Sequence, residues 1–148
     1  MKIEKSKAAS PKGEVTLYTL ENKQGAQVVL SSLGAAICRI DVPDRDGKMA
    51  DVVLGYKNPA DYIADGPCMG KVPGRFANRI CRGKFTLDGK TYSLAINNGP
   101  NALHGGPEGF QNQIWESQEK DGGVLFTYKA KDGEEGYPGN MTVNAFYT

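Results

Sequence analysis

Histidine, cysteine and long apolar runs are scarce in this sequence. Its 148 residues include one histidine, His104, and three cysteines that lack the close paired spacing of zinc sites or redox dithiols. Neither a Walker-type phosphate loop nor a GxSxG nucleophile turn is present. Without a second histidine, metal-dependent hydrolysis and Ser-His chemistry are disfavoured, and we expect no metal site.

Targeting and membrane signals are also lacking. No segment approaches the roughly 20 apolar residues that cross a bilayer, and the charged start "MKIEKSKAAS" is followed by no apolar run. We therefore expect a cytoplasmic protein with no membrane partner. In that reducing compartment Cys38, Cys68 and Cys81 are expected to be free, buried thiols.

Charge of one sign is not in excess. The 18 basic and 17 acidic residues leave a formal net charge of +1 and are interspersed along the chain. Residues 71–84 hold five lysines or arginines, but no recognised nucleic-acid-binding fold accompanies them. They are interpreted as a solvated face, and nucleic acid is not an expected partner.

Glycine, in contrast, is abundant, and the 19 glycines separate short stretches of alternating polarity. The clearest unit is "KFTLDGKTYSLAI" (84–96), a hairpin turning at Asp88-Gly89. Similar period-2 runs are found at 26–32, 35–43, 50–56, 123–130 and 141–148. One short helical turn is expected at 58–65, with Asn58 as cap and Pro59 in first position. The prediction is one all-β domain over residues 1–148, an antiparallel β-sandwich.

The final run "MTVNAFYT" indicates a strand that stops without a turn or a polar tail. Met141, Val143, Ala145 and Tyr147 would face one way, and native domains rarely expose such an edge at a terminus. We therefore expect the sandwich to be truncated. The expected consequence is association with a missing C-terminal segment, or self-association through exposed strand edges.

Two loops carry the residues suited to ligand binding. In "GKVPGRFANRI" (70–80), Arg79 offers a charged fork of donors and Asn78 offers both a donor and an acceptor. Adjacent strand residues face opposite ways, so both reach one ligand only if the backbone turns there. In "NNGPNALHGG" (97–106), His104 follows a run of turn formers. A salt-bridged surface arginine and a structural histidine are the alternatives.

Three motifs in order resemble the aldose 1-epimerase, or galactose mutarotase, family. They are "GRFANRI" (74–80), "LDGKTYSLAINNGPNALHGGPEGF" (87–110) and "DGEEGYPGN" (132–140). The resemblance implies a β-supersandwich whose members interconvert the anomers of free hexoses such as galactose and glucose without a cofactor. It implies that Asn78, Arg79 and His104 bind the sugar, with His104 orienting it near the ring oxygen.

The resemblance also implies what is missing. In the family the general acid, a histidine, and the general base, a glutamate, come from the later part of a chain roughly twice this length. Glu108, Glu134 and Glu135 lie outside the motif of that base. We therefore expect the N-terminal portion of an aldose 1-epimerase, holding part of a hexose site and inactive alone.

Two alternatives remain. One is a non-catalytic carbohydrate-binding module on a truncated sandwich, in which Asn78, Arg79 and His104 still hold a sugar. The other is a relative that acts on hexose 6-phosphates, with Arg75 or Lys71 binding the phosphate.

Overall fold

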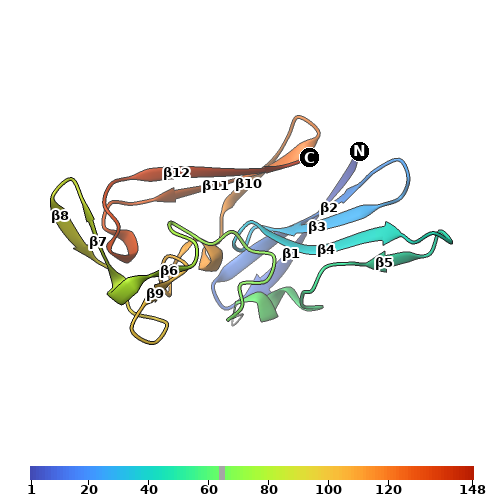
Figure 1. Cartoon of the computed structure of the whole chain (residues 1–148). Helices are drawn as coiled ribbons and strands as arrows, with labels where there is room; N and C mark the ends of the chain where they lie inside the picture. The colour runs from blue at the N-terminus through green and yellow to red at the C-terminus, as the bar shows by residue number, and fades with distance from the viewer. Residues whose placement is uncertain (64–65) are drawn as a thin grey trace.

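The computed structural model describes residues 1–63 and 66–148, and its strands form two main antiparallel sheets (Figure 1). The larger sheet has five strands in chain order: β1 (Lys2–Ser10), β2 (Gly13–Glu21), β3 (Gln27–Ser31), β4 (Ala36–Pro43) and β5 (Met49–Asp51). The smaller has three: β10 (Glu116–Lys120), β11 (Gly123–Ala130) and β12 (Met141–Tyr147).

Two short strand pairs complete the β structure: β6 (Arg79–Ile80) with β9 (Ala102–Leu103), and β7 (Lys84–Leu87) with β8 (Lys90–Ser93). The helical elements in the described part are short 3-10 turns: η1 (Pro59–Tyr62), η2 (Cys81–Gly83), η3 (Phe110–Asn112) and η4 (Glu134–Gly136). None of these helices has the length and apolarity needed to span a membrane.

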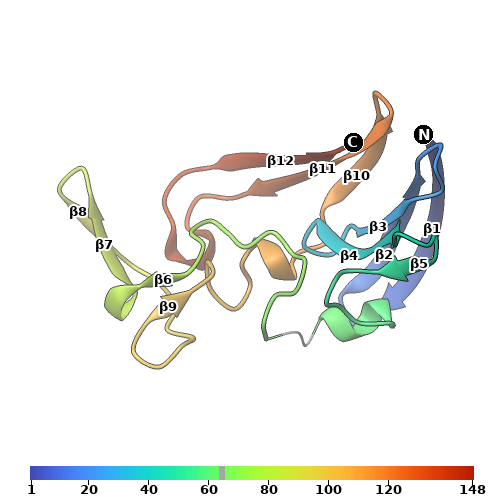
Figure 2. The same ribbon diagram turned by 45° about the vertical axis from the view of Figure 1, so that its right-hand side comes forward.

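The core lies between the two main sheets, which form separate layers in Figures 1 and 2. Alternation along β2 turns Tyr18 and Leu20 toward Phe126 of β11, and the Tyr18 and Phe126 rings meet edge-to-face at 6.0 Å. Trp115 packs at the end of this cluster, edge-on to Phe110 at 6.0 Å. The expected all-β antiparallel sandwich is confirmed.

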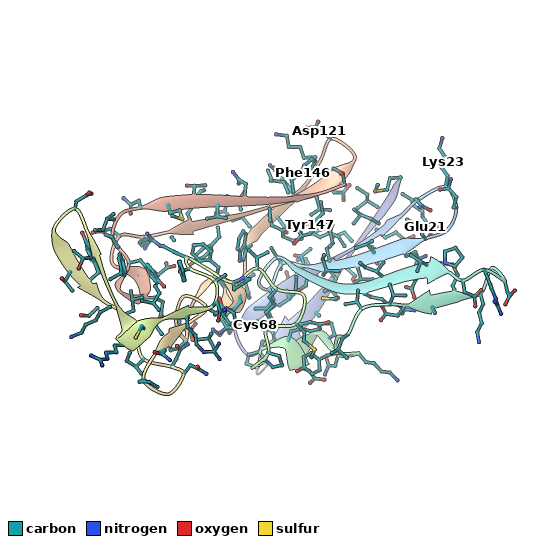
Figure 3. The ribbon with its side chains drawn as sticks, in the orientation of Figure 1. Glu21, Lys23, Cys68, Asp121, Phe146 and Tyr147 are labelled. Carbon is teal, nitrogen blue, oxygen red and sulfur yellow. The ribbon has the colours of Figure 1, made fainter. Side chains whose placement is uncertain are left out.

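The last strand shows which side of the smaller sheet is covered. Tyr147 points toward the five-stranded sheet and donates its hydroxyl to the carbonyl of Ala35 at 2.7 Å, whereas Phe146 points outward (Figure 3). Val143 and Ala145 share the inward face with Tyr147. Met141, which alternation places on the same face, is exposed at the start of the strand.

The Asp88-Gly89 hairpin is confirmed as β7 and β8, and it stands apart from both sheets in Figures 1 and 2. The φ angles of 51° at Asp88 and 76° at Gly89 are those of a type I′ turn. The second strand ends at Ser93, however, so the alternation expected up to Ile96 does not hold and Ile96 is exposed.

The short helical turn is confirmed where the structure describes it. The side chain of Asn58 accepts a hydrogen bond from the backbone N–H of Ala60 at 3.1 Å, and Pro59 is the first helical residue. Residues 64 and 65, included in that expectation, lie outside the described residues.

Two further expectations need correction. The strand expected at 50–56 stops at Asp51, whose carboxylate accepts from the backbone N–H of Val53 and closes a turn. Cys81 is exposed and Cys68 is half-buried, so the expectation of a buried thiol is wrong for these two cysteines. Cys38 is buried as expected, and burial raises the pKa of its thiol to about 11. Strands β1, β2 and β10 were not predicted.

We predict that two phenylalanines of the smaller sheet differ sharply in their contribution to stability. Phe126→Ala opens a cavity in the core and should lower the free energy of unfolding by about 3–5 kcal/mol. Phe146→Ala removes an outward side chain and should cost under about 1 kcal/mol. Urea unfolding followed by the fluorescence of Trp115 measures both, and similar losses would contradict the two-layer arrangement.

Candidate functional site

The candidate site forms where the short strands β6 and β9 pair. Arg79 lies opposite Leu103, so Asn78, before β6, meets His104, after β9. The backbone N–H of Asn78 donates to Nδ1 of His104 at 2.9 Å, and the backbone N–H of His104 donates to the carbonyl of Asn78 at 2.9 Å. The structure thus brings together the three residues that the sequence singles out.

The backbone turns at this junction. Asn78 and His104 have φ angles of 68° and 52°, in the left-handed region that residues other than glycine seldom adopt. The turn places the side chains of Asn78 and Arg79 on one side, where Nη1 of Arg79 donates to Oδ1 of Asn78 at 3.0 Å. The condition for two adjacent residues to reach one ligand is therefore met.

Arg79 is held by amide oxygens. Its Nε donates to Oδ1 of Asn98 at 2.8 Å, in addition to the bond to Asn78, and no carboxylate pairs with it among the described residues. Arg79 is exposed, so the guanidinium keeps N–H groups available to solvent or a ligand. This arrangement differs from the salt-bridged surface arginine that was the alternative.

The imidazole of His104 has one nitrogen available to a ligand. Because a backbone N–H can only donate, Nδ1 must be the acceptor of the bond from Asn78, and the neutral ring carries its proton on Nε2. His104 is half-buried, and its Nε2–H is the ring donor that the bond from Asn78 leaves available. Together the three side chains can donate to several oxygens of a polyhydroxylated ligand.

The loop before His104 is built from asparagine side chains. Asn97 holds Leu103 as a second strand would: its Nδ2 donates to the carbonyl at 3.0 Å and its Oδ1 accepts the N–H at 2.7 Å. Sequence reasoning treated Asn97 and Asn98 only as turn formers, and so missed that Asn98 fixes Arg79. The signal present in the sequence was the amide side chain of each asparagine, which is short enough to hydrogen-bond to groups nearby in the same loop.

Glycines let this loop lie against the loop of Arg79. A Cβ on Gly105 would lie 1.7 Å from the carbonyl oxygen of Gly74, so only glycine fits there. The same carbonyl of Gly74 accepts from the backbone N–H of Phe110 at 3.1 Å. The two loops are thus in direct backbone contact.

The two cations considered for a phosphate are engaged elsewhere. Lys71 is buried and its Nζ donates to the carbonyl of Tyr62. The guanidinium of Arg75 donates to three carbonyls, those of Lys131 (2.7 Å), Pro138 (2.9 Å) and Gly139 (2.7 Å). Neither arrangement supports phosphate binding.

An apolar cavity of about 570 Å³, which Arg79 helps to line, opens between β7 and the segment before β12. Three of its lining side chains are large and exposed: Phe76 (50%), Leu87 (49%) and Met141 (43%). Ile80 and Tyr137 also line it. Within the described residues, no group of three or more His, Cys, Asp or Glu side chains is placed to hold a metal ion.

The fold and site define an antiparallel β-sandwich with a preorganised cluster of hydrogen-bond donors on paired loops. The family model described as aldose 1-epimerase matches residues 16–148, and the chain belongs to this family.

Several relatives support the assignment. The chain is 47% identical over 136 residues to galactose mutarotase of Bos taurus, covering 92% of this chain and 40% of that protein. It is 36% identical over 147 residues to aldose 1-epimerase of Escherichia coli K12, covering 98% of this chain and 42% of that protein.

Solved structures agree. An aldose epimerase homologue from C. elegans superposes with a TM-score of 0.84 at 33% identity, covering 98% of this chain and 42% of that one. Galactose 1-epimerase from Lactobacillus acidophilus gives a TM-score of 0.83 at 27% identity, covering 99% and 44%. The chain therefore spans roughly two fifths of the length of the curated relatives it matches.

We predict that neutral His104 is the Nε2–H tautomer. A long-range ¹H–¹⁵N spectrum should show a protonated Nε2 and an unprotonated Nδ1, because Nδ1 accepts from Asn78. His104→Ala should then speed hydrogen exchange of the Asn78 amide. The amide of Gly133, which donates to the carbonyl of Tyr137, is the control and should be unaffected. A proton found on Nδ1 would contradict the site geometry.

Proposed function

We propose that these 148 residues form the sugar-orienting part of an aldose 1-epimerase site for free hexoses such as galactose and glucose. The observation that carries the proposal is the pair of hydrogen bonds between Asn78 and His104, which leaves Nε2–H as the donor of the His104 ring, while Arg79 bonds to the side chain of the same Asn78. Membership of the family and the relatives named as galactose mutarotases support the choice of substrate class.

Each side chain has a chemical task in this proposal. A planar guanidinium donates two parallel hydrogen bonds, which match the vicinal hydroxyls of a hexose, and Arg79 is held in one orientation by Asn98 and Asn78. The Asn78 amide can donate to a neighbouring hydroxyl. Nε2–H of His104 donates to one lone pair of the ring oxygen. The sugar is thereby oriented, and the other lone pair of that oxygen can receive a proton.

The reaction itself requires two proton transfers. One group protonates the ring oxygen while another removes the proton of the C1 hydroxyl; the ring opens, the C1–C2 bond rotates and the ring recloses on the other face. We assign both transfers to groups on further polypeptide. Glu108, which pairs with Lys12 at 2.5 Å, and Glu134, which accepts from the Tyr128 hydroxyl at 3.0 Å, are already engaged.

The partner in this proposal is a polypeptide that supplies the acid and base, and a second copy of the chain is the alternative. The apolar cavity beside Arg79, with Phe76, Leu87 and Met141 exposed around it, is a surface that such a polypeptide would cover. The cytoplasm is the proposed compartment, and the exposed thiol of Cys81 suits a reducing environment.

A non-catalytic carbohydrate-binding module is the second candidate. It is favoured by one observation, that the donors are fixed by the chain's own contacts and need nothing added to bind a sugar. It differs from the first candidate in one prediction: added polypeptide should not increase the rate of anomer interconversion.

Hexose binding tests both candidates. We predict that D-galactose or D-glucose at millimolar concentration shifts the NMR signals of Asn78, Arg79 and His104. Arg79→Ala should weaken binding about tenfold or more, because it removes charge-assisted hydrogen bonds. Arg82→Ala is the matched control. Arg82 is also exposed, and within the described part of the chain its hydrogen bond is made by the backbone N–H, which donates to Oδ1 of Asn101 and is kept in the variant. A flat titration of the unaltered chain would contradict both candidates.

Polarimetry separates the two candidates. With freshly dissolved α-D-galactose, we predict that the purified chain alone gives no acceleration over buffer, since losing two proton-transfer groups costs on the order of 10⁴-fold or more. Adding the part of the bovine relative that the chain does not cover, as a separate polypeptide, should restore activity if the first candidate holds. Clear acceleration by the chain alone would overturn the assignment of the acid and base.

A further inference from the structure

A third loop contacts both loops of the site. Residues 131–140, here named the bridging loop, close on themselves: the N–H of Gly133 donates to the carbonyl of Tyr137 at 2.8 Å, and the N–H of Asp132 donates to Oδ1 of Asn140 at 2.9 Å. The loop is thus a defined unit, with the turn η4 at its centre.

Both ends of the bridging loop are bound to the loop of Asn78 and Arg79. Arg75, four residues before Arg79, donates to the carbonyls of Lys131, Pro138 and Gly139, which lie at the two ends of the bridging loop. A guanidinium that donates to three carbonyls fixes its own backbone relative to all of them.

The centre of the bridging loop is bound to the loop of His104. Oε1 of Glu135 accepts from the backbone N–H of Glu108 at 3.1 Å. Oε2 of Glu135 lies where a side chain would stand on Gly106: a Cβ there would approach it to 2.0 Å. The carboxylate therefore contacts the backbone at Gly106 and Glu108, in the segment that follows His104.

This position is an unfavourable one for a glutamate. Glu135 has a φ angle of 51°, and burial raises the pKa of its carboxyl, with the charges of Glu108 and Glu134 raising it further and the Glu108 amide opposing them. The neighbouring residues secure the loop without it. Glu134 accepts from the hydroxyl of Tyr128, and Tyr137 stacks on Phe85 with ring centroids 5.9 Å apart.

We propose that Glu135 is a positioning residue, whose carboxylate holds the backbone of residues 104–108 so that His104 stays against Asn78. Arg75 fixes the opposite loop to the same unit, and the bridging loop thereby sets the spacing between Arg79 and His104. The consequence of this positioning role for sugar binding rests on the proposed function, whereas the effect of Glu135 on the order of residues 104–108 does not.

The first test needs no sugar. Glu135→Ala and Glu135→Asp both remove the acceptor from Glu108, the second while keeping the charge. Both should raise hydrogen exchange of the Glu108 and Asn78 amides about tenfold or more, and weaken the His104 Nδ1 signature. Glu135→Gln keeps an acceptor oxygen and should stay within about twofold of the unaltered chain. Glu119→Ala, at an exposed glutamate of β10, is the control and should change neither amide.

The midpoint of thermal unfolding distinguishes positioning from a general contribution to stability. Because the Glu135 charge is unfavourable in the fold, Glu135→Gln should unfold at the same temperature or higher, with site order retained. Unchanged exchange at Glu108 and Asn78 in both Glu135→Ala and Glu135→Asp would overturn the proposal. If Glu135→Ala fails to fold, Glu135→Asp decides.

The second test adds D-galactose to the same variants. Glu135→Ala and Glu135→Asp should bind it about tenfold more weakly, and Glu135→Gln about as well as the unaltered chain. If the unaltered chain binds no hexose, the proposed function fails while the exchange measurements still decide the positioning role. If it binds hexose and all Glu135 variants bind equally, the positioning role fails and the proposed function stands.

Discussion

The two hydrogen bonds between Asn78 and His104 are the contacts on which this side of the molecule depends. Each residue holds a left-handed backbone angle that costs a non-glycine residue about 1 kcal/mol or more, and each hydrogen bond contributes a net of about 0.5–1.5 kcal/mol. The gain and the cost are of similar size. A site of this kind persists only where surrounding structure holds the two backbones in place.

That surrounding structure is largely backbone packed on backbone. Gly105 and Gly109 lie so close to the carbonyl of Gly74 that a Cβ at either would collide with it. From there contacts lead into the core: Phe110 donates to Gly74, and the carbonyl of Phe110 accepts from the indole of Trp115 at 2.9 Å. The exposed polar site is therefore tied within a few residues to the aromatic cluster between the sheets.

The features predictable from sequence were those encoded by a few adjacent residues. Asp88-Gly89 specifies its turn, Asn58-Pro59 its helical start, and period-2 runs most of β3, β4, β11 and β12. Strand β1 has charged residues at four of its six exposed positions, and β2 has apolar residues on both faces, so neither shows clean alternation. Positive φ angles at Asn78 and His104, and the contacts of Arg75 and Glu135, depend on loops distant in sequence. No local pattern encodes them.

The occupied nitrogen of His104 has a consequence for how the ring can take part in chemistry. A histidine that relays protons accepts a proton at one ring nitrogen while releasing a proton from the other, and so needs both nitrogens accessible. Here Nδ1 is filled by an amide that cannot leave without undoing the β6–β9 junction. The ring can therefore donate through Nε2 alone, which suits a residue that presents one hydrogen bond in one direction and not a residue that relays protons.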